Sequence, residues 1–142
     1  MPKFEWNEAT YAVGVPKIDD EHRQIFRLAS DLERAIMAGA PASEIQPLVE
    51  DLVIHAAKHF SYEERAMRQS RYRLYAWHQQ RHNLARARIK ALERSIRCGD
   101  RDPAIELLDF LFAWLSDHAR LADRMLAAHL RNYQRELMAR AS

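Results

Sequence analysis

Five histidines occupy positions on the apolar faces of predicted amphipathic helices, where leucine or isoleucine is usual. They are His22, His59, His78, His82 and His118. Glu63 follows His59 by four residues and His82 follows His78 by four, so each pair shares a helix face, because four residues advance about 400°. Asp123 follows His118 by five residues, about 140° away on a straight helix, so it needs a shifted angle or a local π-bulge to reach the same point. The spacing therefore predicts one inward cluster.

An inward cluster of imidazoles and carboxylates favours a bound metal. A lone inward histidine is more often a core residue with a hydrogen-bond partner, but five together change that balance. Burying the Glu63 carboxylate without a partner is costly, and no Lys or Arg occupies an inward position. Imidazole and carboxylate donors suit iron, zinc, copper or manganese, and the single Cys98 excludes a thiolate cluster.

The number of donors favours two ions. Five histidines and two carboxylates exceed the capacity of one ion, but they fit two if both carboxylates and an oxo or hydroxo group bridge the pair. One ion then has three histidines, and the other has two histidines and an open position. An open position beside a redox partner suits reversible dioxygen binding, and the centre lacks a free general base.

We expect an oxygen binder and no enzyme; the alternatives are a peroxidase, oxidase or nitric oxide reductase using the same site. A purely structural bundle or a nucleic-acid adaptor leaves Glu63 and the histidines unexplained.

Helices must position these residues. Three Gly and five Pro among many Ala, Leu, Arg and Glu favour an all-α fold. Residues 1–17 are expected to form an extended arm whose aromatic side chains pack on helices. Asp19 or Asp20 is the expected N-cap of the first helix, which Gly39 ends, and Ser43 with Gln46 resembles a capping box for the second.

The third helix is expected to end at Gly99. Its six inward residues are His78, His82, Ala85, Ile89, Leu92 and Ile96. Asp102 and Pro103 are expected to start the fourth helix as N-cap and first helical residue. Its inward residues are Ile105, Leu108, Leu111, Leu115, His118 and Ala122. Short connections between such helices predict an up-down-up-down four-helix bundle.

The length of 142 residues fits one domain: the arm at 1–17, a metal-binding bundle at 18–125 and a helical extension at 126–142. The net charge of +2 gives no strong field, so nucleic acid and membrane are not expected partners. The sequence has no membrane-length apolar run and no signal-peptide pattern, and a single cysteine fits a reducing cytoplasm. We therefore expect a cytoplasmic protein.

These residues resemble the hemerythrin family, especially its single-domain bacterial members. The similarity runs from Trp6 to about Met125. The stretch His59-Phe60-Ser61-Tyr62-Glu63-Glu64 resembles the motif H-F-x-x-E-E, and His78 with His82 resembles H-x-x-x-H. Trp114 to His118, followed by Asp123, resembles the closing motif W-L-x-x-H-x-x-x-x-D. All seven positions in order make this a specific signal.

The resemblance implies two iron ions. His78, His82 and His118 would hold the coordinatively full iron, His22 and His59 the open one, and Glu63 and Asp123 would bridge. It also implies an apolar oxygen pocket lined by Phe60, Trp114, Leu115, Ala119 and Ala122. Ala119 and Ala122 stand where the family often carries bulkier aliphatic residues, so we expect wider access for dioxygen or for azide, nitric oxide or peroxide. His55 and His129 are not expected to bind metal.

Overall fold

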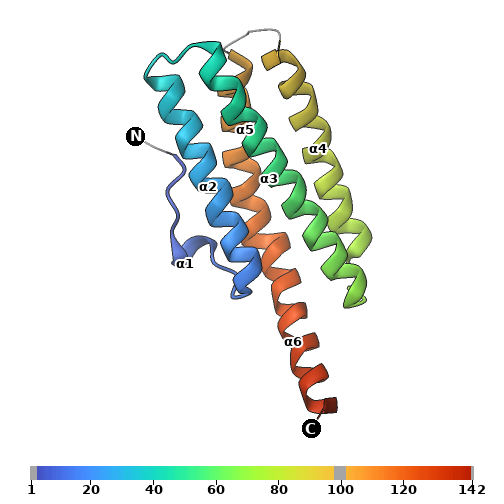
Figure 1. Ribbon diagram of the computed structural model, residues 1–142. Helices are drawn as coiled ribbons and strands as arrows, with labels where there is room; N and C mark the ends of the chain where they lie inside the picture. Colours follow the sequence, from blue (N-terminus) through green and yellow to red (C-terminus); the bar gives the residue numbers. More distant parts are fainter. Residues whose placement is uncertain (1–2, 98–101, 142) are drawn as a thin grey trace.

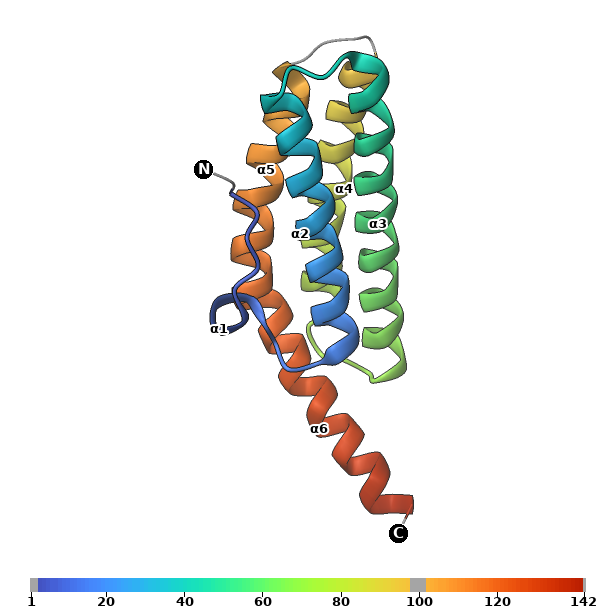
Figure 2. The same ribbon diagram turned by 60° about the vertical axis from the view of Figure 1, so that its left-hand side comes forward.

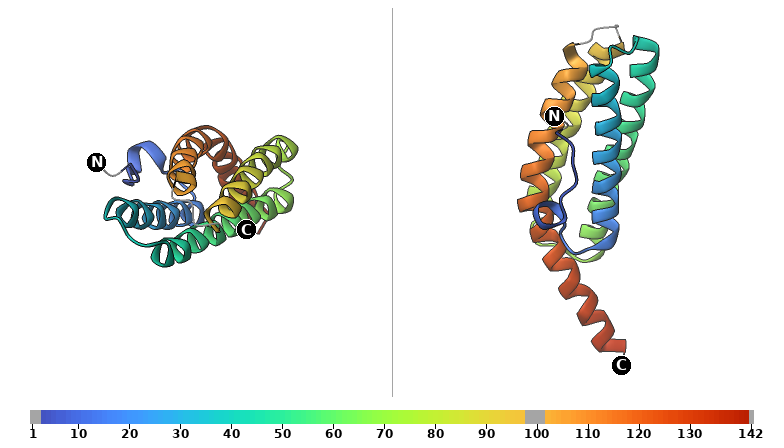
Figure 3. Two further views of the ribbon diagram at one scale, coloured as in Figure 1. Left: turned by 90° about the horizontal axis from the view of Figure 1, so that it is seen from above. Right: turned by 90° about the vertical axis from the view of Figure 1, so that its left-hand side faces the viewer.

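The computed structural model describes residues 3–97 and 102–141, which are almost entirely helical. Its elements are α1 (Glu8–Tyr11), α2 (Pro16–Met37), α3 (Ala42–Gln69), α4 (Tyr75–Arg97), α5 (Asp102–His118), the π-helical turn η1 (Ala119–Asp123) and α6 (Arg124–Ala141). The helices α2, α3, α4 and α5 run alternately up and down around one axis (Figure 1, Figure 3). Each packs against its neighbours, and α5 returns to α2. The predicted four-helix bundle is confirmed. No described helix is both long and apolar enough to cross a bilayer.

Two helix ends follow from residues in the left-handed region of backbone conformation. Gly39 (φ 74°) ends α2 as predicted: the Gly39 N–H bonds the Ile36 carbonyl at 3.1 Å, and the Ala40 N–H bonds Ala35 at 3.0 Å. This pair of bonds is the Schellman arrangement, which glycine favours because it has no Cβ. Arg71 (φ 56°) ends α3 in the same way, so the chain reverses there without a glycine. The predicted end at Gly99 lies outside the described residues.

Two of the predicted helix starts are wrong. Helix α2 begins at Pro16, because a proline fits the first turn, and its N-cap is Val15. Asp19 lies inside the first turn, and its carboxylate accepts the N–H groups of Val13 and Gly14 at 2.8 and 3.1 Å. Helix α3 begins at Ala42, and its N-cap is Pro41, which makes no side-chain hydrogen bond. Ser43, the predicted cap, is therefore already inside the helix. Asp102 and Pro103 stand at the start of α5, within one residue of their predicted places.

The apolar side chains form two clusters, one on each side of the inward histidines. The larger contains Ile25, Leu52, Ile89 and Leu111, and the smaller contains Ile18, Met67, Tyr72 and Leu126. The six inward positions predicted for α4 are all buried. Ile105 is an exception to the α5 stripe, because it is 43% exposed while Ala104 and Leu107 are buried. The polar cluster therefore has a packed hydrophobic layer at both ends.

The N-terminal arm crosses the face between α2 and α5 (Figure 2). As predicted, its aromatic side chains pack on a helix: the rings of Phe4, Trp6 and Tyr11 lie 5.7, 5.5 and 4.9 Å from the Phe26 ring. The arm is not wholly extended, because α1 forms a short helix in which the Asn7 side chain accepts the Thr10 N–H. Arg124 of α6 donates to the Thr10 carbonyl at 3.1 Å, which ties the arm to the last helix.

Helix α6 continues the line of α5 and projects past the other helices (Figure 1, Figure 2). Leu126 and Ala127 are buried in the smaller cluster, whereas Leu137 and Met138 are 46% and 70% exposed. The division of the chain at residues 125 and 126 stays a prediction.

Candidate metal centre

The structure brings the seven predicted ligand residues together in the middle of the bundle. Each is at most 1% exposed. Their donor atoms form two groups that share Glu63 and Asp123. We call the group with His78, His82 and His118 the three-histidine half, and the group with His22 and His59 the two-histidine half.

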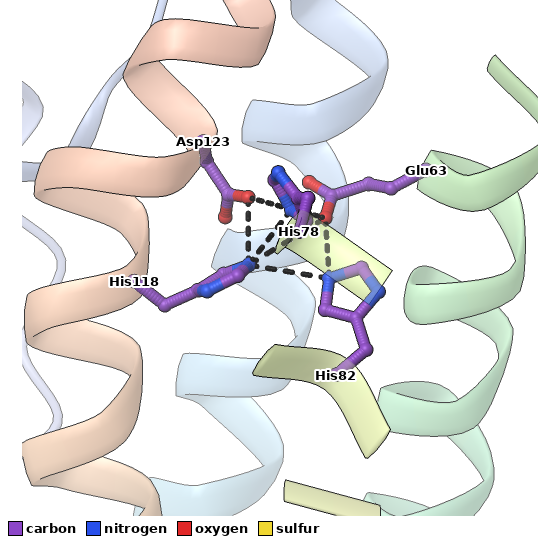
Figure 4. A group of neighbouring side chains, drawn as sticks. All are labelled: Glu63, His78, His82, His118 and Asp123. Carbon is purple, nitrogen blue, oxygen red and sulfur yellow. Dashed lines mark hydrogen bonds and ion pairs between the residues drawn. The ribbon is translucent and has the colours of Figure 1, made fainter. Parts of the chain in front are cut away.

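The three-histidine half comes from helices α4 and α5 (Figure 4). His78 and His82 lie one turn apart on α4, and His118 is the last residue of α5. The Nε2 atom of His118 lies 3.0 Å from that of His78 and 3.2 Å from that of His82. Three imidazole nitrogens therefore face one point.

The two-histidine half comes from α2 and α3. The Nε2 atoms of His22 and His59 lie 2.9 Å apart. Both rings point toward the same carboxylates as the other three, since the donor atoms of His22 and His59 lie within 4.8 Å of those of Glu63 and Asp123.

Each shared carboxylate turns one oxygen to each half. Oε1 of Glu63 lies 3.3 and 3.0 Å from His78 and His82, while Oε2 lies 3.3 Å from His59. Oδ1 of Asp123 lies 2.9 Å from His118 and 3.2 Å from His78, while Oδ2 lies 3.0 Å from His22. This is the placement that a pair of bridging carboxylates requires.

The π-helical turn η1 explains how Asp123 reaches the cluster. The five residues of η1, Ala119–Asp123, follow His118 directly. A π-turn spreads more residues over one turn than an α-helix does, so a spacing of five returns to the same face. Of the two possibilities that the spacing left open, a shifted angle and a π-bulge, the structure shows the π-bulge. It brings Oδ1 of Asp123 to 2.9 Å from Nε2 of His118.

The donor set fits a pair of metal ions better than a hydrogen-bonded network. A neutral imidazole has one N–H and one acceptor nitrogen, so three Nε2 atoms that face one another cannot all hydrogen-bond one another. Among the described residues, Oε2 of Glu63 and both oxygens of Asp123 are buried with no hydrogen-bond partner of regular geometry, although histidine nitrogens lie 2.9 to 3.3 Å away. A metal with bonds of about 2.1 Å holds adjacent donors about 3 Å apart, close to the observed separations. Nitrogen and oxygen donors of this kind suit first-row transition metals.

Without metal, protons on the histidines balance the two carboxylates. Burial lowers the pKa of His59, but the charge of Glu63 and the hydrogen bonds to Glu21 and Glu63 outweigh it and raise the pKa to about 10. For His78, burial is likewise outweighed by the hydrogen bonds to Asp123 and Glu63, and its pKa rises to about 9. Burial raises the pKa of Glu63, yet the charged His59 and several histidine hydrogen bonds hold it well below its usual range. The site is thus built to keep both carboxylates ionised.

Polar residues around the cluster contact the outer nitrogens of three rings. Glu21 contacts Nδ1 of His59 at 2.8 Å, and Glu64 contacts Nδ1 of His82 at 2.8 Å. Arg86 lies 2.6 Å from Glu64, and Nε of Arg81 approaches Nδ1 of His118 at 3.3 Å. Sequence reasoning missed these roles, because Glu21, Arg81 and Arg86 lie outside the apolar stripes. The sequence signal that was available is that Glu21 directly precedes His22 and Arg81 directly precedes His82.

The predicted pocket residues pack around the histidine rings. The Phe60 ring stacks on His82 with centroids 4.5 Å apart, and the Trp114 ring stacks on His118 at 4.2 Å. Leu115, Ala119 and Ala122 are 3%, 2% and 0% exposed. The two aromatic residues therefore cover the three-histidine half, and their role in a ligand pocket stays a prediction.

The other two histidines lie away from the cluster. Nδ1 of His55 lies 2.9 Å from the Asp51 carbonyl of its own helix. Nε2 of His129 lies 3.0 Å from the Ser70 carbonyl at the bundle end. Neither belongs to either group of converging donors.

Comparisons with known proteins agree with this arrangement. Residues 13–130 match the family model described as the hemerythrin HHE cation binding domain. A bacteriohemerythrin of Stenotrophomonas maltophilia is 27% identical over 128 residues, which cover 87% of this chain and 82% of that protein. A myohemerythrin of Sipunculus nudus is 29% identical over 120 residues, which cover 84% and 88%. A crystal structure of wild-type hemerythrin matches with a TM-score of 0.80 at 25% identity, covering 89% of this chain and 96% of that one. The chain belongs to the hemerythrin family.

Proposed function

We propose that this protein binds two iron ions at the seven-residue cluster and binds dioxygen reversibly there. The observation that supports this most strongly is the pair of shared carboxylates, each with one oxygen toward three histidines and the other toward two. The hemerythrin-type relatives support iron as the metal.

In this proposal His78, His82 and His118 would hold one iron and His22 and His59 the other, with Glu63, Asp123 and an oxo or hydroxo group shared between the two ions. Bound iron supplies the electrons and the open coordination position that dioxygen needs. The seven side chains that would hold the ions are buried and converge. Two unequal halves leave one ion with a free position.

Apolar and aromatic residues have a separate task in this proposal. Phe60 and Trp114 hold the planes of His82 and His118 by stacking. Together with Leu115, Ala119 and Ala122 they exclude water, and a dry site slows charge separation and irreversible oxidation. Dioxygen is the proposed ligand, and azide, nitric oxide and peroxide are further small ligands of the same site. The physiological role would be storage, delivery or sensing of oxygen.

The test is reconstitution of the metal-free protein with Fe(II) under anaerobic conditions. We expect two iron ions per chain and a visible charge-transfer absorption that appears with air and disappears when oxygen is removed. Loss of the absorption without recovery, or binding of a single ion, would contradict the proposal. Rapid turnover of peroxide or nitric oxide by the iron-loaded protein would instead indicate a di-iron enzyme.

A further inference from the structure

Glu21 is the outer partner of the two-histidine half. It lies on α2 directly before His22, and its Oε1 atom accepts a hydrogen bond from Nδ1 of His59 at 2.8 Å. A carboxylate at this nitrogen keeps the proton on Nδ1, so the lone pair of Nε2 faces the centre. The contact thus fixes both the tautomer and the orientation of His59.

The other ring of this half has no comparable support. Within residues 3–97 and 102–141, Nδ1 of His22 is buried without a hydrogen-bond partner. The position of His59 therefore depends on Glu21, whereas the His22 ring has no outer hydrogen bond among these residues. Loss of Glu21 would leave both rings of the half without an outer hydrogen bond in the described structure.

The charge around the three-histidine half is different. Glu64 contacts His82, but Arg86 lies 2.6 Å from the same oxygen and neutralises it. The guanidinium of Arg81 faces His118 at 3.3 Å. Glu21 is opposed by Lys17 at 3.4 Å, and the Lys17 side chain is 58% exposed, so water screens that cation. The two-histidine half therefore receives more net negative charge from its outer residues.

We infer that Glu21 is a positioning residue of the two-histidine half: its hydrogen bond orients His59 for metal, and its negative charge favours the more oxidised ion there. This inference rests on the proposed function, and it assigns to Glu21 an effect on the two-histidine half alone. Glu21 is also the outer carboxylate with the greater solvent contact, since its side chain is 18% exposed and that of Glu64 is 9% exposed.

The first experiment separates the hydrogen bond from the charge. Glu21→Ala removes both, whereas Glu21→Gln keeps an oxygen that can accept from His59. Zinc titration against a chromophoric chelator should show a 10- to 100-fold weaker second site in Glu21→Ala, roughly the effect of removing an outer partner. Glu21→Gln should recover most of that affinity. The matched control is Asp20→Asn, because Asp20 is exposed and pairs with Arg23 away from the cluster; it should bind two ions as the wild type does.

The second experiment measures the charge alone. In the iron-loaded protein, Glu21→Gln should raise the midpoint potential relative to wild type and Asp20→Asn, because removing a negative charge favours the ferrous state. A purely structural role would not move this potential. Thermal unfolding of each metal-free variant checks that the bundle is intact.

The outcomes distinguish this inference from the proposed function. Wild-type affinity for both zinc ions in Glu21→Ala, or an unchanged potential in Glu21→Gln, would overturn the role of Glu21. If the wild type binds two zinc ions but its iron form shows no reversible absorption with air, the proposed function fails, and the zinc titration still decides the inference.

Discussion

The two halves of the cluster share both carboxylates yet differ in the helices that supply their rings and in the charges of their outer residues. The three-histidine half takes two rings from one helix, has aromatic rings stacked on His82 and His118, and has the cations Arg81 and Arg86 beside it. The two-histidine half takes one ring from each of two helices and has the carboxylate of Glu21 beside it. The number of histidines in each half therefore follows from helix geometry, because two histidines one turn apart on α4 add a third ring to one half alone.

The largest effect on metal binding is expected from removal of a residue that both halves use. Asp123→Ala should weaken binding of both ions by more than about 100-fold, beyond the loss expected for an outer partner, because each Asp123 oxygen faces a different half. Zinc titration with chelator competition measures this. Asp117→Asn is the control, since Asp117 is exposed near the end of α5. Retention of one tightly bound ion by Asp123→Ala would show that the halves are independent.

A substitution in one half should leave the other occupied. His22→Ala removes one of two rings from the two-histidine half, so the purified protein should hold one iron per chain and lose the reversible absorption with air. Elemental analysis and the visible spectrum give both numbers. His55→Ala should keep two ions, because its ring contacts the Asp51 carbonyl. Loss of both ions from His22→Ala would argue against separate halves.

Metal binding to both halves should depend on pH. The pKa values of His59 and His78 are raised to about 10 and about 9 in the metal-free protein, so metal must displace a proton from each ring. Affinity should rise about tenfold per pH unit for each displaced proton and should level off once the pH exceeds the raised pKa values of the rings. Zinc competition titrations from about pH 6 upward would measure these slopes.

The same shifts set the stability of the metal-free protein. A raised histidine pKa contributes stability that is fully present below the unfolded pKa of about 6.5 and is lost as pH rises through the folded value. The melting temperature of the metal-free protein should therefore fall between about pH 7 and about pH 10, while the metal-loaded protein loses less. A flat profile for the metal-free protein would contradict this balance of charges.

The smallest expected effect concerns the apolar side of the site. Ala119 is 2% exposed beside His118, and a larger aliphatic residue there should narrow the path to the ions and lengthen the lifetime of the oxygenated form several-fold. Ala119→Ile tests this beside Ala113→Ile, a control at an exposed position of α5. Because added volume can strain a packed core, Ala119→Val serves as a milder variant. An unchanged lifetime in both Ala119 variants would reject the idea of wider access.

The sequence predicted the bundle and the converging residues because apolar periodicity and ligand spacing both follow from helix geometry. All six inward positions of α4 were correct, and the π-turn is one of the two ways in which the five-residue spacing to Asp123 was expected to reach the site. Helix starts were harder, because Pro16 and Pro41 set them through local backbone constraints while Asp19 and Ser43 matched capping patterns. Whether the seven residues bind iron stays a proposal.

The outer contacts were beyond such reasoning for a different reason. Glu21, Arg81 and Arg86 are polar residues off the core stripe, and side chains at such positions usually face solvent. Their long side chains bend back toward His59, His118 and Glu64. Which long side chain bends inward depends on neighbouring helices, and that information is absent from the period of a single helix.

The π-turn η1 makes the number of residues between His118 and Asp123 as important in this centre as the identity of the residues. A pattern that allows only α-helical spacing would pair His118 with Ala122, one position before the carboxylate. The additional residue also resets the phase of the following helix, so the buried Leu126 and Ala127 must be counted from Asp123 and not from the stripe of α5. Transplanting the centre into an idealised bundle would therefore require an encoded insertion in the fourth helix, or a carboxylate moved one position nearer the histidine.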